Sequence, residues 1–134
     1  MSVEANIGIA KRWMEGFTSG RDPDEIAASF ADDLDFEIQG DDGALPWLGK
    51  KTGRSAMADF ARDYSKFAKP VTLEVEDVLA NENRAVIVAS GQTLMKATGK
   101  IVATKLAIVL TIRDDVVIRF QMFEDSFGVS KAAR

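Results

Sequence analysis

The chain has 134 residues, the size of one ordinary domain, and its 46% hydrophobic and 28% charged residues are typical of a globular protein. It contains no cysteine and no histidine, which excludes disulfides, thiolate metal sites and any nucleophile that a histidine activates. Its net charge of −4, with one short basic cluster at residues 50–54, argues against a nucleic-acid partner.

The hydropathy pattern argues equally against a membrane protein. No apolar run approaches the length of a transmembrane helix; the run at residues 106–110, for example, has the length of a strand. The first ten residues lack the basic start and the apolar run of a signal peptide. We therefore expect a single domain over residues 1–134, located in the cytoplasm, with no membrane partner, no metal ion and no cofactor.

Two helices are predicted in the first part of the chain. Over residues 3–17, apolar side chains that include Trp13 and Phe17 recur at helical spacing, opposite a charged face. This helix should end near Gly20. A second, short helix should follow Asp22, because an aspartate can cap a helix whose first residue is proline.

A strand and an apolar loop come next. Residues 34–39 alternate strictly between apolar and polar side chains, which predicts a half-buried strand. Its inward side chains should be Leu34, Phe36 and Ile38. Glycines, two adjacent aspartates and a proline at residues 40–53 predict a loop without regular structure. The loop contains Trp47, and an apolar loop of this length usually covers a core edge or a ligand.

A third helix and four strands are predicted in the remainder of the chain. Residues 53–68 have a wide apolar stripe that includes Phe60 and Tyr64, and Lys69-Pro70 should end this helix. The pattern then changes to a period of two residues. The four strand-like runs cover residues 71–79, 84–95, 101–112 and 116–127. Their connections are short enough to join only antiparallel neighbours.

Helices followed by a strand meander define an α+β fold, with three N-terminal helices packed on the concave side of a strongly curved antiparallel sheet. In the run at residues 101–112, the even-numbered side chains, among them Leu110, are the more apolar and should face the helices. The odd-numbered side chains are too apolar for a face left in water. We therefore expect part of the convex side to form a homodimer interface.

The last predicted strand ends in an acidic residue, Glu124. In an unbroken strand, Glu124 closes an apolar face formed by Val116, Ile118, Phe120 and Met122. A carboxyl group among apolar side chains is costly to ionise unless another group satisfies it or the function uses it. Glu124 is therefore either a pocket acid with a raised pKa or a carboxylate that pairs with Arg54 or Lys51 at the rim.

Three short motifs occur in order along the chain. They are Phe30-Ala31-Asp32-Asp33 before the first strand, Gly53-Arg54 at the start of the third helix, and Arg119-Phe120 followed by Phe123-Glu124-Asp125. With these motifs the chain resembles the SnoaL-like, or polyketide-cyclase-like, group of the nuclear-transport-factor-2-like superfamily. The resemblance implies a cone with an apolar small-molecule pocket at its open end, commonly in a homodimer. The superfamily includes enzymes and binding modules, so the fold does not fix the function.

The resemblance also allows a comparison of individual positions. Where ketosteroid isomerases have their three catalytic groups, this chain has Trp13, Ile38 and Leu110, which argues against that apparatus. Scytalone dehydratase depends on histidines, and this chain has none; the Asp-Arg-Asp arrangement of epoxide hydrolases has no counterpart in residues 101–112. SnoaL cyclases use an acid near the last strand, where Glu124 or Asp125 could serve.

These observations predict a pocket for a small hydrophobic or aromatic ligand. Its expected wall consists of Trp13, Phe17, Phe36, Ile38, Trp47, Phe60, Leu110, Phe120 and Met122. Glu124 is the candidate catalytic acid-base, and Tyr64 or Trp13 is the candidate donor that orients a ligand oxygen. Alternatively, Tyr64 is a core residue with its hydroxyl at the surface, and Trp47 is either a lid or an anchor of its loop.

Three hypotheses remain open from the sequence. The first is a cofactor-free lyase, isomerase or cyclase that acts on a hydrophobic or aromatic carbonyl compound. The second is a noncatalytic ligand-binding or accessory domain, and the third is a protein with a closed pocket that works through its convex sheet. A metal site is not expected, because the spacing of Asp32, Asp33 and Asp35 matches no calcium loop.

Overall fold

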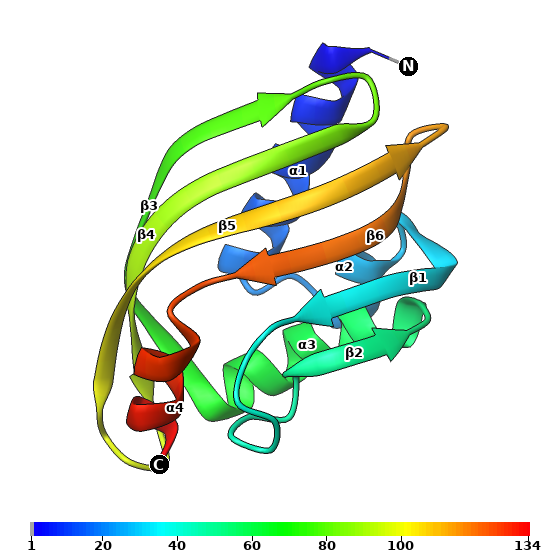
Figure 1. The fold of residues 1–134 in the computed structure, drawn as a ribbon. Helices are drawn as coiled ribbons and strands as arrows, with labels where there is room; N and C mark the ends of the chain where they lie inside the picture. Colours follow the sequence, from blue (N-terminus) through cyan, green and yellow to red (C-terminus); the bar gives the residue numbers. More distant parts are fainter. Residues whose placement is uncertain (1) are drawn as a thin grey trace.

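The computed structural model of the chain describes residues 2–134, which form four helices and six strands (Figure 1). In chain order these are α1 (Val3–Thr18), α2 (Pro23–Ala27), β1 (Phe30–Ile38), β2 (Gly49–Thr52), α3 (Arg54–Phe67), β3 (Ala68–Ala80), β4 (Arg84–Met95), β5 (Ile101–Arg113), β6 (Val116–Phe123) and α4 (Ser126–Ala133). The strands form one curved sheet in the order β2-β1-β6-β5-β4-β3, and α1, α2 and α3 lie on one face of it (Figure 1). The predicted α+β fold class is confirmed.

The first two helices begin where the sequence predicts them. The Ser2 hydroxyl accepts a hydrogen bond from the Ala5 amide at 3.0 Å, and the Asp22 carboxylate accepts one from the Glu25 amide at 3.3 Å. These side chains satisfy amides that have no partner within the first helical turn. Pro23 occupies the start of α2, where its missing N–H removes no helical hydrogen bond.

The sheet contains the predicted antiparallel meander and one parallel ladder. Strands β3, β4, β5 and β6 pair antiparallel in sequence, as their short connections require. Strand β1 runs parallel to β6, with Phe36 opposite Phe120 and Ile38 opposite Met122. Helix α3 and strands β2, β3, β4 and β5 lie between β1 and β6 in the sequence, so the connection is long enough for a parallel crossover. The sheet is therefore mixed rather than purely antiparallel.

The loop predicted at residues 40–53 is irregular only in its first part. Its last residues form β2, which pairs antiparallel with β1. The prediction failed here because glycines were taken to exclude a strand. Gly49 and Gly53, with φ of 104° and 109°, instead lie at the start of β2 and just after its end, and the two lysines between them are extended.

Strand β3 begins at Ala68, immediately after α3, and not at residue 71 as predicted. Lys69 and Pro70 end the helix as expected, but they already belong to the strand. Proline is tolerated there because β3 is the edge strand of the sheet, where one row of backbone groups needs no partner.

The last strand is shorter and less regular than predicted. A bulge in β6 places Val117 opposite Ile112, so Val117 is fully buried on the inner face in place of Val116 and Ile118. The strand then ends at Phe123, and the predicted continuation to residue 127 is wrong.

Helix α4 follows β6 and was not predicted. The Asp125 carboxylate caps it by accepting a hydrogen bond from the Gly128 amide at 3.0 Å, which satisfies an amide of the first helical turn. The helix has only eight residues, and tertiary contacts stabilise it: Val129 and Ala132 are buried, and the Thr98 hydroxyl donates to the Ala132 carbonyl at 2.6 Å.

The core lies between the sheet and α1, α2 and α3. Leu34, Phe36 and Ile38 are fully buried, as the alternation in their strand predicts. The rings of Phe36 and Phe120 stack with their centroids 5.4 Å apart, which joins the inner faces of β1 and β6. The inward set of β5 is likewise buried or half-buried, with Leu110 fully buried.

The convex face of the sheet has a small apolar area on its central strands. Val86 is opposite Val109 and Val88 is opposite Ala107, and all four side chains are half-buried. Phe123 is opposite Ala107 on the next strand. This area includes Ala107 and Val109, two of the odd-numbered β5 residues that the sequence analysis identified as unusually apolar for the convex face.

In the part of the chain that the structure describes, no helix is both long and apolar enough to cross a membrane.

Gly91 of β4 provides a test of the sheet. A Cβ atom at this position would lie 2.7 Å from the Thr72 carbonyl oxygen, because a bulge in β3 brings the two backbones together. We expect Gly91→Ala to lower the free energy of unfolding by about 1 to 3 kcal/mol, as for other changes that force a packed backbone to move. Urea denaturation measures the change. Ser90→Ala on the neighbouring half-buried position is the control, and equal stability of the two variants would contradict the predicted clash.

Candidate functional site

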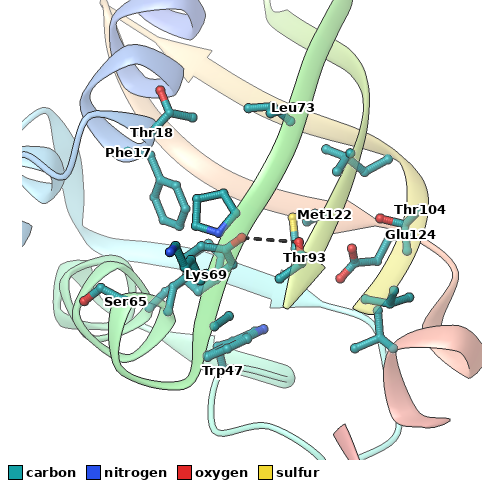
Figure 2. Close-up of a pocket in the computed structure, with 18 of the residues that line it drawn as sticks. Phe17, Thr18, Trp47, Ser65, Lys69, Leu73, Thr93, Thr104, Met122 and Glu124 are labelled. Carbon is teal, nitrogen blue, oxygen red and sulfur yellow. Dashed lines mark hydrogen bonds between the residues drawn. The ribbon is translucent and has the colours of Figure 1, made fainter. Parts of the chain in front are cut away.

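A cavity of about 560 Å³ lies between the sheet and the helices. Its wall is formed by α1, α3, the first half of β3, the inner faces of β4 and β5, the end of β6, the loop before β2, and α4 (Figure 2). Most of the exposed wall is apolar, and its volume is within the usual range for small-molecule pockets. The hypothesis of a closed pocket is not supported, because the cavity has an opening to solvent.

One side of the cavity is a continuous cluster of aromatic rings. Phe17 contacts Trp13 at a centroid distance of 5.2 Å, Phe60 at 4.9 Å and Tyr64 at 5.2 Å. Trp47, from the loop before β2, contacts Tyr64 at 5.7 Å. These rings come from α1, α3 and the loop, and together they form a surface suited to a flat apolar ligand.

Glu124 lies in the cavity although β6 ends one residue before it. In the short connection between Phe123 and the cap of α4, its side chain points to the interior beside Thr104 of β5 (Figure 2). Burial raises the pKa of the Glu124 carboxyl from 4.5 to about 7, the hydrogen bond with the Thr104 hydroxyl opposes this rise, and the nearby Asp125 adds to it. At neutral pH the carboxyl is therefore divided between its neutral and charged forms.

The alternative in which Glu124 is neutralised at the rim is not observed. Arg54 pairs with Asp32 at 2.7 Å and also donates to the Phe30 carbonyl, while Lys51 donates to the Pro46 carbonyl. Among the described residues, the four ion pairs of the protein do not include Glu124. Its carboxyl thus lies in an apolar cavity without an ion-pair partner among the described residues.

Tyr64 of α3 also reaches the cavity. Its hydroxyl lies 3.4 Å from the Thr93 hydroxyl of β4, and either group can be the donor (Figure 2). Burial raises the pKa of the Tyr64 hydroxyl, its hydrogen bond with Thr93 lowers it, and the charge of Glu124 raises it. Tyr64 is therefore protonated at neutral pH and can donate a hydrogen bond to a ligand oxygen.

Trp13 lines the cavity, but its indole N–H is already used. It points to the sulfur atom of Met57 at 3.4 Å. An indole nitrogen has only one proton to donate, so Trp13 contributes ring surface and not a hydrogen bond to a ligand. Of the two donors that the sequence suggested, the geometry leaves Tyr64.

The structure brings together seven of the predicted site residues and places four elsewhere. The cavity wall includes Trp13, Phe17, Trp47, Phe60, Tyr64, Met122 and Glu124. Four others belong to the fully buried core beneath it and do not line it, namely Phe36, Ile38, Leu110 and Phe120. They were placed in the wall because the alternation identifies an inward face but not the depth at which the helices cover it.

Two polar residues of the site were missed. Thr93 and Thr104 lie on the inner faces of β4 and β5 and contact Tyr64 and Glu124. The alternation in both runs places these threonines on the inward face, so a polar residue on an otherwise apolar face was the available indication. Only the fold shows which carboxyl or hydroxyl each of them contacts.

The loop before β2 is hydrogen-bonded to α4. The Asp41 carboxylate accepts hydrogen bonds from the Ser130 hydroxyl at 2.7 Å and from the Arg134 guanidinium at 2.9 Å. These bonds and the Arg134 charge lower the pKa of Asp41. The loop carries Trp47, which is almost fully buried. This contact agrees with the role of Trp47 as an anchor of the loop.

No group of three or more carboxylates that could hold a metal ion occurs in residues 2–134. Two of the three aspartates considered for a metal site pair with arginines instead: Asp32 with Arg54 at 2.7 Å, and Asp35 with Arg119 at 2.9 Å.

Comparison with solved structures gives the same architecture. An NTF2-like protein from Burkholderia xenovorans is similar over 100% of this chain and 99% of its own, with a TM-score of 0.86 and 20% identity. A proposed isomerase from Rhodopseudomonas palustris is similar over 93% and 95%, with a TM-score of 0.80 and 16% identity. A proposed SnoaL-like polyketide cyclase from Mesorhizobium loti is similar over 87% and 96%, with a TM-score of 0.70 and 17% identity. At these identities the similarity establishes the fold.

The fold therefore places the protein in the NTF2-like class of α+β domains. More narrowly, the sequence matches the SnoaL-like domain over residues 10–120, and the chain belongs to this family. No match was found among curated proteins.

The pKa of Glu124 predicts a dependence of stability on pH. Because the carboxyl has a pKa of about 7 in the folded protein and 4.5 without burial, the folded protein binds more protons between these pH values. The free energy of unfolding should therefore fall as the pH rises through this window, by about 1 to 3 kcal/mol. In Glu124→Gln this part of the slope should disappear. Urea denaturation at a series of pH values tests it, with Glu76→Gln on the exposed edge strand as the control; an unchanged slope in Glu124→Gln would contradict the assignment.

Proposed function

We propose that the protein binds a small hydrophobic or aromatic carbonyl compound in this cavity and transfers a proton on it without a cofactor, as a lyase, isomerase or cyclase. Glu124 is the acid-base of the reaction and Tyr64 is the donor to the carbonyl oxygen. The observation that carries the proposal is the position of Glu124, an acid in an apolar cavity with no cationic side chain of residues 2–134 paired to it.

The environment of Glu124 supports this role. A general acid-base is most effective when its pKa is near the working pH, and the pKa of Glu124 is about 7. The Thr104 hydroxyl holds the carboxyl from the side of β5. A carboxyl at the surface, with its pKa near 4.5, would be a much weaker base at the same pH.

The position of Tyr64 supports its role as the oxygen-orienting donor. Tyr64 comes from α3, and its hydroxyl lies 3.4 Å from the Thr93 hydroxyl of β4, while Glu124 follows β6 and lies beside Thr104 of β5 (Figure 2). The charge of Glu124 contributes to the raised pKa of Tyr64, which supports the action of both groups on one ligand. A flat ligand between them would have its carbonyl oxygen at Tyr64 and its adjacent carbon at Glu124.

The chemical step balances with these two groups alone. The Glu124 carboxylate takes a proton from the carbon next to the carbonyl, and the electron pair of that C–H bond moves into the carbonyl to form an enolate. The hydrogen bond from Tyr64 stabilises the negative oxygen. Glu124, now protonated, returns the proton to the same or another carbon, or to a leaving oxygen. Phe17, Trp47, Phe60 and Met122 hold the apolar body of the ligand and exclude water.

A binding or accessory domain without chemistry is the second candidate. The observation that favours it is the apolar character of the positions that resemble the catalytic ones of ketosteroid isomerases: Ile38 and Leu110 are fully buried, and the Trp13 N–H is bonded to Met57. In this case the aromatic cluster binds the ligand, and Glu124 affects only which ligand binds, without taking part in a reaction. The two candidates differ in turnover and not in binding.

We also propose that the protein is a homodimer that associates through the convex face of the sheet. The apolar area around Val86, Val109 and Phe123 supports this proposal. A cytoplasmic location remains a prediction from the sequence.

Proton transfer can be tested before the natural ligand is identified. We expect the protein to accelerate the exchange of hydrogen for deuterium next to the carbonyl of tetralone, a compact aromatic ketone, in heavy water, followed by NMR. Glu124→Gln should lower this rate by about 10²-fold to 10⁴-fold, because it removes the acid-base. Tyr64→Phe should lower it by about 10-fold to 10³-fold through loss of the donor.

Glu76→Gln is the matched control, since it makes the same change on the exposed edge strand. If the wild-type protein and Glu124→Gln both bind the ketone, as followed by tryptophan fluorescence, but neither accelerates exchange, the catalytic proposal is wrong and the binding domain is supported.

The dimer proposal predicts a change of mass in solution. Val109→Glu places a charge in the centre of the convex apolar area and should convert the dimer to a monomer, because an interface with an unpaired buried charge is strongly destabilised. Light scattering coupled to gel filtration measures the mass. Val71→Glu, at an exposed position of the edge strand, should leave the dimer unchanged. A monomeric wild-type protein would disprove the proposal.

A further inference from the structure

Two lysines line the cavity and are exposed to solvent, and we call this part of the cavity its opening. Lys69 of β3 and Lys96, which follows β4, both line the cavity together with Ser65 of α3. Figure 2 shows Lys69 and Ser65 on one side of the cavity, and Glu124 with Thr104 on the other. The cavity is therefore polar at two separated ends and aromatic between them.

The backbone brings the two lysines to the same place. Strand β3 begins directly after α3, and its first residue, Ala68, pairs with Met95 at the end of β4. The Lys96 amide continues this ladder by donating to the Phe67 carbonyl at 3.0 Å. Lys69 and Lys96 are thus next to the same pair of facing residues, where the sheet meets the end of α3.

Both ammonium groups are available at this opening. Lys96 donates to the Ser65 carbonyl at 2.7 Å, which uses one of its three protons. Neither lysine takes part in the four ion pairs formed within residues 2–134, and both side chains are exposed. Glu124 is the only acidic residue of the described cavity wall, and it lies on the other side. The opening is thus locally positive in a protein with a net charge of −4.

We propose that the ligand of this cavity is an organic acid, with an anionic oxygen group such as a carboxylate that binds Lys69 and Lys96 at the opening. The apolar body of the ligand extends along the aromatic cluster and presents its carbonyl to Tyr64 and Glu124. This inference rests on the proposed use of the cavity for a hydrophobic carbonyl compound, and it adds the charge and the orientation of that compound.

The physical reason is the difference between the two ends. An anion near Glu124 would lose its hydration in an apolar environment and would be repelled by that carboxylate. At the opening it remains partly hydrated and meets two cations. The ligand can therefore enter in only one direction, with its neutral end first, and this direction brings the carbonyl to the acid-base.

A pair of fluorescent dyes isolates the charge. Anilinonaphthalene sulfonate and N-phenylnaphthylamine share the same apolar rings, and only the first has an anionic group. The two tryptophans of the chain, Trp13 and Trp47, both line the cavity, so quenching of their fluorescence reports binding there. We expect the wild-type protein to bind the sulfonate more tightly than the neutral dye. The Lys69→Gln/Lys96→Gln variant should bind the sulfonate about threefold to tenfold more weakly and the neutral dye unchanged.

The control variant, Lys11→Gln/Lys50→Gln, removes the same total charge at exposed positions outside the cavity wall, and should not change either affinity. Lys69→Gln alone removes one charge but keeps the hydrogen bond between Lys96 and Ser65. If this variant loses part of its affinity for the sulfonate while its thermal stability is unchanged, the loss comes from the missing charge and not from a disturbed α3.

Four results would overturn the inference. If both dyes lose affinity equally, or if the control variant has the same effect as the double variant, the opening does not select an anion. If neutral-dye binding and the effect of Glu124→Gln on ketone exchange persist while the sulfonate shows no preference, only the inference fails. If neither dye quenches the tryptophans of the wild-type protein, the inference fails together with the proposed use of the cavity.

Discussion

The parallel ladder between β1 and β6 is the interaction on which the site depends. It joins the first strand of the chain to the last, and the stacked rings of Phe36 and Phe120 fix the two strands on their inner face. Trp13 of α1 and Phe60 of α3 both contact Phe120, at 5.2 and 6.2 Å. These aromatic residues form the packed core that supports the cavity. They determine where the chain leaves β6 and therefore where Glu124 points.

A carboxyl group in that position has a cost that its surroundings reduce only in part. The Thr104 hydroxyl stabilises the charged form, but burial is the larger effect and the pKa remains near 7. A protein under no functional constraint would gain stability from an apolar residue there. Glu124, Tyr64 and the aromatic cluster line one cavity, and this arrangement is the basis of the proton transfer that we propose.

The two ends of the cavity also differ in charge. Its inner end is acidic, its opening has two lysines, and the surface between them is mostly aromatic and aliphatic. Such an arrangement orients a ligand that is itself polar at both ends, because reversal would place like charges together and bury an anion. Orientation of this kind contributes to catalysis when the reacting carbon must meet one fixed base.

Local sequence patterns were sufficient to predict most of the helices and strands. The apolar stripes gave α1 and α3, the capping pattern gave α2, and the alternation gave the meander and the buried set in β1, with Glu124 and Tyr64 as the candidate reactive groups. They did not determine β2, α4 or the bulge at Val117, because these are short and are stabilised by contacts with distant residues. The packing of the elements shows that Phe36 and Phe120 belong to the core and not to the cavity wall, that the Trp13 N–H points to Met57, and that Lys69 and Lys96 both line the cavity. Alternation assigns a side chain to a face, whereas its depth, its partner and its distance from a residue elsewhere in the chain follow from how the elements pack.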